Sequence, residues 1–366
     1  MRILQRSMAL AFSFVLVAAC SNDLERAALV AGPRILAIVT DPPEAAPGQD
    51  VHVRVLAVDP HPPDPMHPRE LRYTFRLCID PQSFFGGFTP DGTQGLDAPA
   101  IVCLPLRGNG NTATVPGALL QTVTDALPMY AAQAHLDPAP VEQALATYGI
   151  PLQIRVAVSA IDPATGTETT LISGVKQFGL TMRAQRTTNP PYVYFAIGKS
   201  VFLGGLPNGS FECTLWFSDP PSFPASVVDP GDNNYEKQRY AVLSPLDNPF
   251  DWMETYPYLD YSSQLRTGRE GAYYSWYTSS DRSGHCVVPA QLGGREGQDQ
   301  CHTIVSGDET TQVSATAMRS DPQALAGRDA VWILPRVPGT YDVWLVVRDG
   351  HLGESACHTT IEVTAP

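Results

Sequence analysis

Basic residues are scarce in this chain of 366 residues, and the scarcity narrows its possible partners. Its formal net charge is -13, and its only lysines are Lys176, Lys199 and Lys237. A protein that binds nucleic acid needs a basic surface to neutralise phosphates. The composition therefore excludes DNA and RNA as main partners.

Recognisable catalytic motifs are also missing. The sequence contains no G-x-S-x-G and no H-E-x-x-H, and its Gly-rich stretches lack a Walker lysine. The stretch DRSGHC, residues 281–286, places Asp, Ser and His together, but without the nucleophile elbow of a hydrolase. We therefore predict no catalytic residue, no cofactor and no enzyme activity.

Long apolar runs are absent too, except for a short one at the N-terminus. Residues 8–19 follow Arg2 and Arg6 and span about a dozen positions, whereas a membrane helix needs about 20. This pattern is typical of a secretory signal peptide, and Val17-Ala18-Ala19-Cys20 resembles the bacterial lipobox. An ordinary signal peptide with an incidental cysteine, or a buried N-terminal helix, is the alternative.

The lipobox resemblance implies a location for the protein. Residues 1–19 would be removed, Cys20 would carry the lipid (palmitate among its acyl chains), and residues 20–32 would form a tether. The rest of the chain would be held at a membrane only by Cys20. Ser21 replaces the aspartate that resembles an inner-membrane retention signal, which favours the outer membrane, on either its periplasmic or its surface face.

Six further cysteines suit a disulfide framework in an exported chain. Cys78 and Cys103 form the only possible pair in the first half. The other four allow three connectivities, of which we prefer Cys213 with Cys357 and Cys286 with Cys301. The neighbouring histidines suggest a metal site, but adjacent side chains of a strand point to opposite faces, so we predict no metal.

Thirty-four prolines and 29 glycines separate short segments whose apolar residues alternate, which indicates a mainly β chain. Val51, Val53 and Val55 fall on one face of such a segment, and His52 and Arg54 on the other. Three segments of the first half recur in the same order in the second half. We predict two β-sandwich domains, residues 33–186 and 192–366, joined by a Pro-rich linker at 187–191.

Two late segments carry a family resemblance. The Tyr274-x-Trp276 strand, followed by PGTYDVWLVVRDG at 338–350, resembles polycystic-kidney-disease-type and related immunoglobulin-like domains. Residues 34–60 are similar to the opening of immunoglobulin-like lipoproteins of the myxobacterial type. The resemblance implies two tandem immunoglobulin-like sandwiches. A tyrosine corner at Tyr341 and a last strand with Cys357 inward and His358 outward fit such a domain.

Two insertions interrupt the expected strands. The first, residues 115–150, has Leu119, Leu120, Val123 and Leu127 at helical spacing, and Pro140 suits the start of a second helix. We predict a small helical insertion that packs over an open end of the first sandwich.

The second insertion, about residues 221–271, is rich in aromatic residues: 11 of the chain's 32 lie between Tyr235 and Tyr277. With the acids Asp251, Glu254 and Asp260 between them, aromatic rings can form a ligand platform. The alternative is a small core, which aromatic side chains serve more often. The candidate ligand-binding residues are Trp252, Tyr256, Tyr258 and Tyr261.

The remaining candidates concern calcium and catalysis. Asp229 and Asp232 lie in a polar turn that offers oxygen ligands, without the spacing of an EF-hand. We predict a non-catalytic binding or structural module of the cell envelope, with a glycan, peptide or envelope protein as ligand. The alternative is an envelope hydrolase, or its accessory carbohydrate-binding module, with Asp251 and Glu254 facing each other across a cleft.

Overall fold

The computed structural model describes residues 30, 32–59, 69–79, 101–133, 139–161, 165–204, 211–217, 222–225, 240–247, 251–259, 264–279, 304–305, 310–313, 330–335 and 337–366. The predicted site residues Cys20, Asp229, Asp232, Tyr261, Cys286 and Cys301 lie outside these ranges, and so does Asp260.

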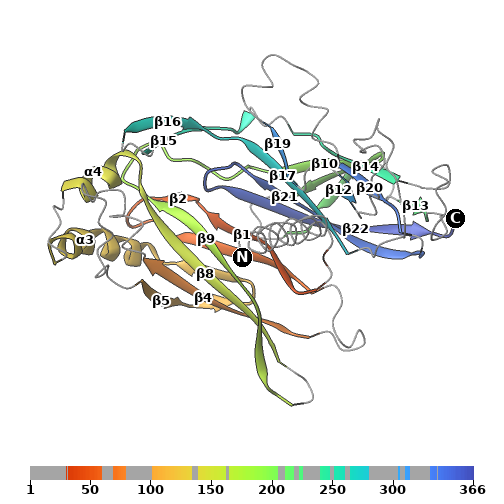
Figure 1. Cartoon of the computed structure of the whole chain (residues 1–366), viewed down its shortest axis with the longest axis horizontal. Coiled ribbons are helices and arrows are strands. Elements are labelled where there is room, and N and C mark those ends of the chain that lie inside the picture. The colour runs from red at the N-terminus through yellow and green to blue at the C-terminus, as the bar shows by residue number, and fades with distance from the viewer. Residues whose placement is uncertain are drawn as a thin grey trace, which may run out of the picture.

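The fold is mainly β, as predicted, and its strands form two β-sandwiches (Figure 1). The N-terminal sandwich has a four-stranded sheet in the order β1-β3-β7-β6, made of β1 (Arg34–Asp41), β3 (Val51–Val58), β7 (Thr112–Val115) and β6 (Gly108–Asn109). Its five-stranded sheet runs β2-β9-β8-β4-β5, made of β2 (Glu44–Ala45), β9 (Glu168–Leu180), β8 (Ile150–Ile161), β4 (Leu71–Ile79) and β5 (Val102–Leu106).

The alternation in β3 places Val51, Val53 and Val55 in the N-terminal core, fully buried, and His52 and Arg54 on the outer face, as predicted. The helical insertion is confirmed as α3 (Gly117–Gln133) and α4 (Ala139–Thr147). Leu120, Val123 and Leu127 of α3 join the same core. The Asp50 carboxylate accepts a hydrogen bond of 2.6 Å from the Gly117 N–H, which caps α3.

The C-terminal sandwich has a six-stranded sheet in the order β12-β11-β10-β14-β20-β18: β12 (Thr214–Phe217), β11 (Ser200–Gly204), β10 (Val193–Ile197), β14 (Tyr240–Pro245), β20 (Ala330–Ile333) and β18 (Ile304–Val305). Its five-stranded sheet runs β13-β22-β21-β17-β19: β13 (Ser222–Pro224), β22 (Glu354–Thr364), β21 (Gly339–Arg348), β17 (Ala272–Thr278) and β19 (Thr310–Val313). A separate hairpin pairs β15 (Thr255–Leu259) with β16 (Leu265–Arg269).

Aromatic side chains fill much of the C-terminal core. Trp276 of β17 is 1% exposed, and its ring meets the ring of Phe195 edge-on at 5.4 Å. The hydroxyl of Tyr341 donates a hydrogen bond of 2.8 Å to the Val337 carbonyl, which is the backbone contact predicted for this tyrosine.

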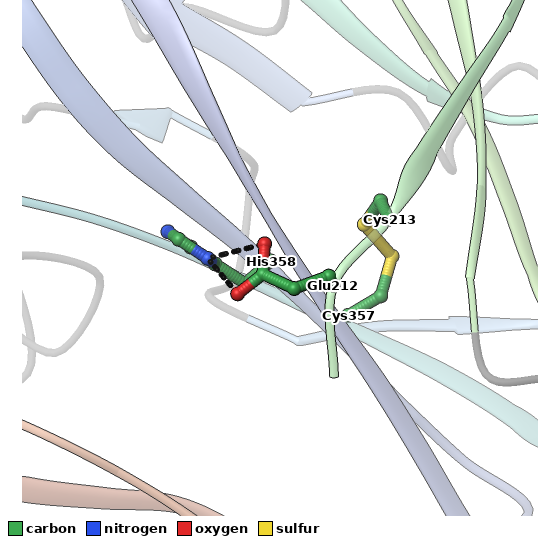
Figure 2. Close-up of a disulfide and its surroundings, with 4 residues drawn as sticks. All are labelled: Glu212, Cys213, Cys357 and His358. Carbon is green, nitrogen blue, oxygen red and sulfur yellow. Dashed lines mark hydrogen bonds and ion pairs between the residues drawn. A yellow bond between two sulfur atoms is a disulfide. The ribbon is translucent and has the colours of Figure 1, made fainter. Parts of the chain in front are cut away.

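Two of the predicted disulfides are present. Cys78 of β4 pairs with Cys103 of β5, directly opposite it in the sheet. Cys213, just before β12, pairs with Cys357 of β22, so this bond joins the two sheets of the C-terminal sandwich. Figure 2 shows how the alternation of β22 separates neighbours, with Cys357 in the disulfide and His358 directed to Glu212.

The two sandwiches contact each other through a third apolar cluster, which we call the junction. From the N-terminal sandwich it takes Leu36, Ala37, Val39 and Leu56 on the outer face of β1 and β3; from the C-terminal sandwich it takes Phe211, Trp344, Val346 and Ala356. The segment between the sandwiches is also hydrogen-bonded to both of them. The Asn189 amide donates to the Thr40 carbonyl at 2.8 Å and accepts from the Glu354 N–H at 2.9 Å.

Candidate functional site

The outer face of the sheet β1-β3-β7-β6 is divided into two parts. The apolar part, which includes Leu36, Val39 and Leu56, is covered by the C-terminal sandwich at the junction. The polar part, on β3, β7 and β6, carries His52, Arg54 and Thr112, and a hollow of about 540 Å³ lies over it. A volume in this range suits a small ligand.

Side chains able to bind a polar ligand line the hollow. Its lining comprises Asp41, His52, Val53, Arg54, Arg107, Gly108, Asn109, Thr112, Ala113 and Thr114. Arg54 and Arg107 supply two guanidinium groups, and Asp41 is the one acid among these residues. The hollow therefore has an excess of positive charge in a protein whose net charge is -13.

Arg54 is fixed in place by its neighbours. Its guanidinium carbon lies 5.4 Å from the centre of the Phe211 ring, which belongs to the junction. Burial lowers the pKa of Arg54, and the nearby Asp41 carboxylate acts in the opposite direction. A guanidinium stays protonated in proteins, so Arg54 presents a partly desolvated positive charge to the hollow.

Gly108, next to Arg107, allows β6 to lie close against the ring of Phe75. A Cβ at Gly108 would lie 2.7 Å from the Phe75 ring, so only glycine lets β6 approach the core so closely. On the neighbouring strands, the Thr114 hydroxyl lies 3.4 Å from His52 Nδ1, and Asp41 is directly opposite His52 in the pairing of β1 with β3. Hydroxyl, imidazole and carboxylate groups thus surround the two arginines.

The structure corrects the predicted aromatic platform at Trp252. Its side chain is 7% exposed and belongs to the C-terminal core. Its indole N–H donates to the Asp247 carboxylate at 3.0 Å, and the Tyr274 hydroxyl donates to the same oxygen at 2.7 Å. A buried tryptophan whose polar atom is satisfied internally offers no face to a ligand.

The other aromatic candidates are divided between two environments. The Tyr256 ring stacks on the His351 ring at 3.8 Å and so contributes to packing within the protein. Tyr258 is 41% exposed on the same strand, and Tyr261 lies outside the described residues. Among the three described platform candidates, Tyr258 is the one whose side chain is exposed to solvent.

Among the predicted acids of the aromatic insertion, Glu254 takes part in internal contacts. The Glu254 carboxylate accepts a hydrogen bond of 2.8 Å from the Thr188 N–H, between the two sandwiches. The Glu254 N–H donates at 2.8 Å to the carboxyl of Glu270, which is 1% exposed. Asp251 is exposed. Glu254 thus helps to hold the insertion against the residues that join the sandwiches.

Two buried carboxyl groups lie close together in this region. Burial raises the pKa of Glu270 to about 8, and the neighbouring Asp349 and Glu254 charges add to the effect. Burial likewise raises the pKa of Asp349 to about 6, against hydrogen bonds from the His351 and Gly353 N–H groups. Glu270 therefore keeps its proton at neutral pH.

Glu44, on the N-terminal sandwich, has the opposite shift. Burial alone raises its pKa, but hydrogen bonds from His351 and the Thr187 N–H, with the Arg183 charge, outweigh burial and lower it. His351 Nε2 lies 3.5 Å from the Glu44 carboxylate, and Lys176 Nζ lies 3.1 Å from the Glu354 carboxylate. These pairs connect the two sandwiches beside the apolar junction.

His358 does not form a metal site with its neighbouring cysteine. Nδ1 lies 3.2 Å from Glu212, and Cys357 is disulfide-bonded (Figure 2). Nε2 lies 2.8 Å from Asp342. Burial opposes protonation of His358, but these two acids raise its pKa. In the part of the chain that the structure describes, no group of three or more His, Cys, Asp or Glu residues is arranged to hold a metal ion.

The hollow was not predicted from the sequence. The alternation in β3 did place His52 and Arg54 on the outer face, but the residues that complete the hollow come from β1, β6 and β7 and from Arg107, which lies between β5 and β6. The sequence signal for the site was the polar outer face of β3, which carries the imidazole of His52 and the guanidinium of Arg54. Without the position of the C-terminal sandwich, that face is indistinguishable from ordinary solvent-exposed surface.

No family model matches the chain. No curated protein matches it either. Among solved structures, it is similar to native alpha-2-macroglobulin of E. coli, with 10% identity and a TM-score of 0.18 over 94% of this chain. It is also similar to dimeric latent PorU of Porphyromonas gingivalis, with 10% identity and a TM-score of 0.17 over 91% of this chain.

The chain spans 17% of the first of these proteins and 24% of the second. Among the described helices, neither α3 nor α4 has the length and apolar character needed to cross a membrane.

Proposed function

We propose that this chain is a non-catalytic binding protein of the cell envelope, anchored through a lipid on Cys20, and that the hollow beside the junction is its ligand site. The observation that carries the proposal is the placement of two arginines in a hollow of about 540 Å³ next to the contact between the sandwiches. Arg54 of the lining also contacts Phe211 of the junction, so the hollow adjoins the C-terminal sandwich.

The envelope location rests on the signal-peptide pattern and the lipobox resemblance. Replacing Cys20 with serine removes the acylated side chain, and we expect the Cys20→Ser protein to leave the membrane fraction, because the rest of the chain supplies no other predicted anchor. Fractionation of cells, with a high-salt wash of the membranes, measures this. Retention of the variant on washed membranes would contradict the anchor.

The ligand site is tested by filling it. Thr114 lies on the outer face of β7 and lines the hollow, so a tryptophan there occupies the space without changing the charge. Thr169→Trp, at an exposed position of β9, is the matched control. We expect envelope glycans or peptides that bind wild type on an array to bind Thr169→Trp equally and to lose most of their binding to Thr114→Trp.

Three results of this array would reject the hollow as the site: equal binding to Thr114→Trp, equal losses in both variants, or no bound ligand for wild type. Melting of each variant accompanies the array, because a folded Thr114→Trp protein is needed for the comparison. If Thr114→Trp is unfolded, Thr112→Phe fills the same hollow from the next outward position of β7.

A further inference from the structure

We infer that the hollow binds an acidic saccharide, whose anionic group is held between Arg54 and Arg107. This inference rests on the proposed function, because it assigns a ligand class to the same hollow. It follows from the charge of the lining, from the kind of neutral groups between the arginines, and from the way that Arg54 is held.

The charges of the lining favour an anion. The lining holds two guanidinium groups, those of Arg54 and Arg107, and a single carboxylate, that of Asp41, so the hollow is positive while the chain as a whole carries -13. Arg107 has no ion-pair partner among the residues that the structure describes. Its charge is therefore not used in folding, and it remains available to a ligand.

The geometry of arginine suits an oxyanion. A planar guanidinium presents several N–H donors at once and can hold two oxygens of a carboxylate or a phosphate. The stack on Phe211 limits the freedom of Arg54, so less entropy is lost when this side chain binds. Partial burial also strengthens its attraction for an anion by reducing the screening by water.

The neutral lining favours a sugar. Thr112 and Thr114 contribute hydroxyl groups and Asn109 an amide, which donate to and accept from sugar hydroxyls. Among the described residues that line the hollow, the one ring is the His52 imidazole, and no Phe, Tyr or Trp offers the broad apolar face on which a neutral sugar stacks. Binding by this surface therefore depends on the charge of the saccharide.

Calorimetry with digalacturonic acid tests the inference, because its methyl ester has nearly the same shape without the charge. We expect wild type to bind the acid at least 10-fold more tightly than the ester, and binding of the acid to weaken as salt is added. Galactose 6-phosphate distinguishes the two sources of anion: tighter binding than the acid assigns the site to phosphorylated sugars, and weaker binding to uronates.

Two variants with opposite expected effects on binding distinguish a ligand contact from a structural role. Arg107→Gln should weaken binding of the preferred acidic sugar about 10-fold or more, whereas Arg72→Gln, at an exposed position of β4, should leave it unchanged. Asp41→Asn removes the one acid from the lining, so it should strengthen binding of the acidic sugar and leave the methyl ester unaffected. A merely damaged fold cannot produce such a gain.

The outcomes are distinguishable from those of the proposed function. If Thr114→Trp abolishes binding of an array ligand but Arg107→Gln and Asp41→Asn do not change that binding, the hollow is the ligand site and the assignment of an acidic saccharide as its ligand is wrong. The same holds if the ester binds as tightly as the acid. If no filling variant affects any ligand, both the proposed function and this inference are wrong.

Discussion

The cores of the two sandwiches are built from different side chains. The N-terminal core is mainly aliphatic, and its fully buried aromatic residues are Phe75 and Phe178. The C-terminal core is richer in aromatic residues, with Phe195, Phe202, Trp252, Tyr274, Trp276 and Trp332 buried among its aliphatic side chains. The aromatic residues of the second half therefore serve mainly to fill its core. The polar hollow lies on the other sandwich, whose core is mainly aliphatic.

The disulfides differ between the sandwiches as well, and removing them gives the largest expected effects. Cys213 and Cys357 are 144 residues apart, against 25 for Cys78 and Cys103. Chain entropy predicts a loss of stability of about 5 kcal/mol without the first bond and about 3.5 kcal/mol without the second. Urea unfolding of Cys213→Ala/Cys357→Ala and Cys78→Ala/Cys103→Ala measures both. A larger loss in the second double variant would break the comparison.

Trp252 sharpens the difference between an aromatic core and an aromatic platform. We expect Trp252→Ala to lower the free energy of unfolding by about 3–5 kcal/mol, since the side chain is buried and its N–H bond to Asp247 is lost. Trp252→Phe, which keeps a ring and loses the N–H, should cost less. Urea unfolding measures both variants. If Trp252→Ala lowered the free energy of unfolding by less than about 1 kcal/mol, the Trp252 side chain would be exposed and not part of the core.

A pH dependence should come mainly from the C-terminal sandwich. Native Glu270 keeps its proton up to about pH 8, whereas the unfolded residue loses it near its ordinary pKa of 4.5. The native state then binds more protons than the unfolded state between these values, so stability is greatest at the acid end and falls as pH rises toward 8. Asp349, raised to about 6, adds to the fall in the lower part of the window.

Urea unfolding between pH 5 and pH 8 measures this slope. Glu270→Gln should reduce it, and the slope that remains reports Asp349 and His358, whose raised pKa has the same sign. Glu44 acts in the opposite direction, but its lowered pKa places its effect below this window. An unchanged slope in Glu270→Gln would show that this carboxyl is ionised in the native protein.

The strand pattern was predictable because it depends on local alternation. Val51, Val53 and Val55 faced the core and His358 faced away from Cys357, as a period of two requires. The tyrosine contact of Tyr341 followed from a short motif, and the bond between Cys78 and Cys103 from the cysteine count. The bond between Cys213 and Cys357 was the preferred one of three connectivities, among which cysteine parity alone does not choose. Both helices appear where helical spacing and Pro140 placed them.

The site was not predictable in the same way, because it depends on contacts between distant segments. Whether an aromatic side chain lies in a core or on a surface is decided by the sheet that covers it, and Trp252 and Tyr258 are only six positions apart. The linker at 187–191 is a second case in which contacts with distant segments could not be predicted from the sequence. Its prolines predicted a break between domains, but Thr187 and Asn189 are hydrogen-bonded to the N-terminal sandwich, so the segment is part of the contact.

Tyr258 gives the smallest expected effect and is the last test of the aromatic surface. Its ring is 41% exposed on β15, and it lies at 6.1 Å from the partly buried ring of Tyr256. Tyr258→Ala should therefore change the free energy of unfolding by less than about 0.5 kcal/mol, whereas Tyr256→Ala should cost more because it removes the stack on His351. If Tyr258→Ala also leaves array binding unchanged, the hollow alone accounts for recognition. A loss of binding at unchanged stability would instead add the hairpin to the ligand surface, and the aromatic sandwich would then share recognition with the aliphatic one.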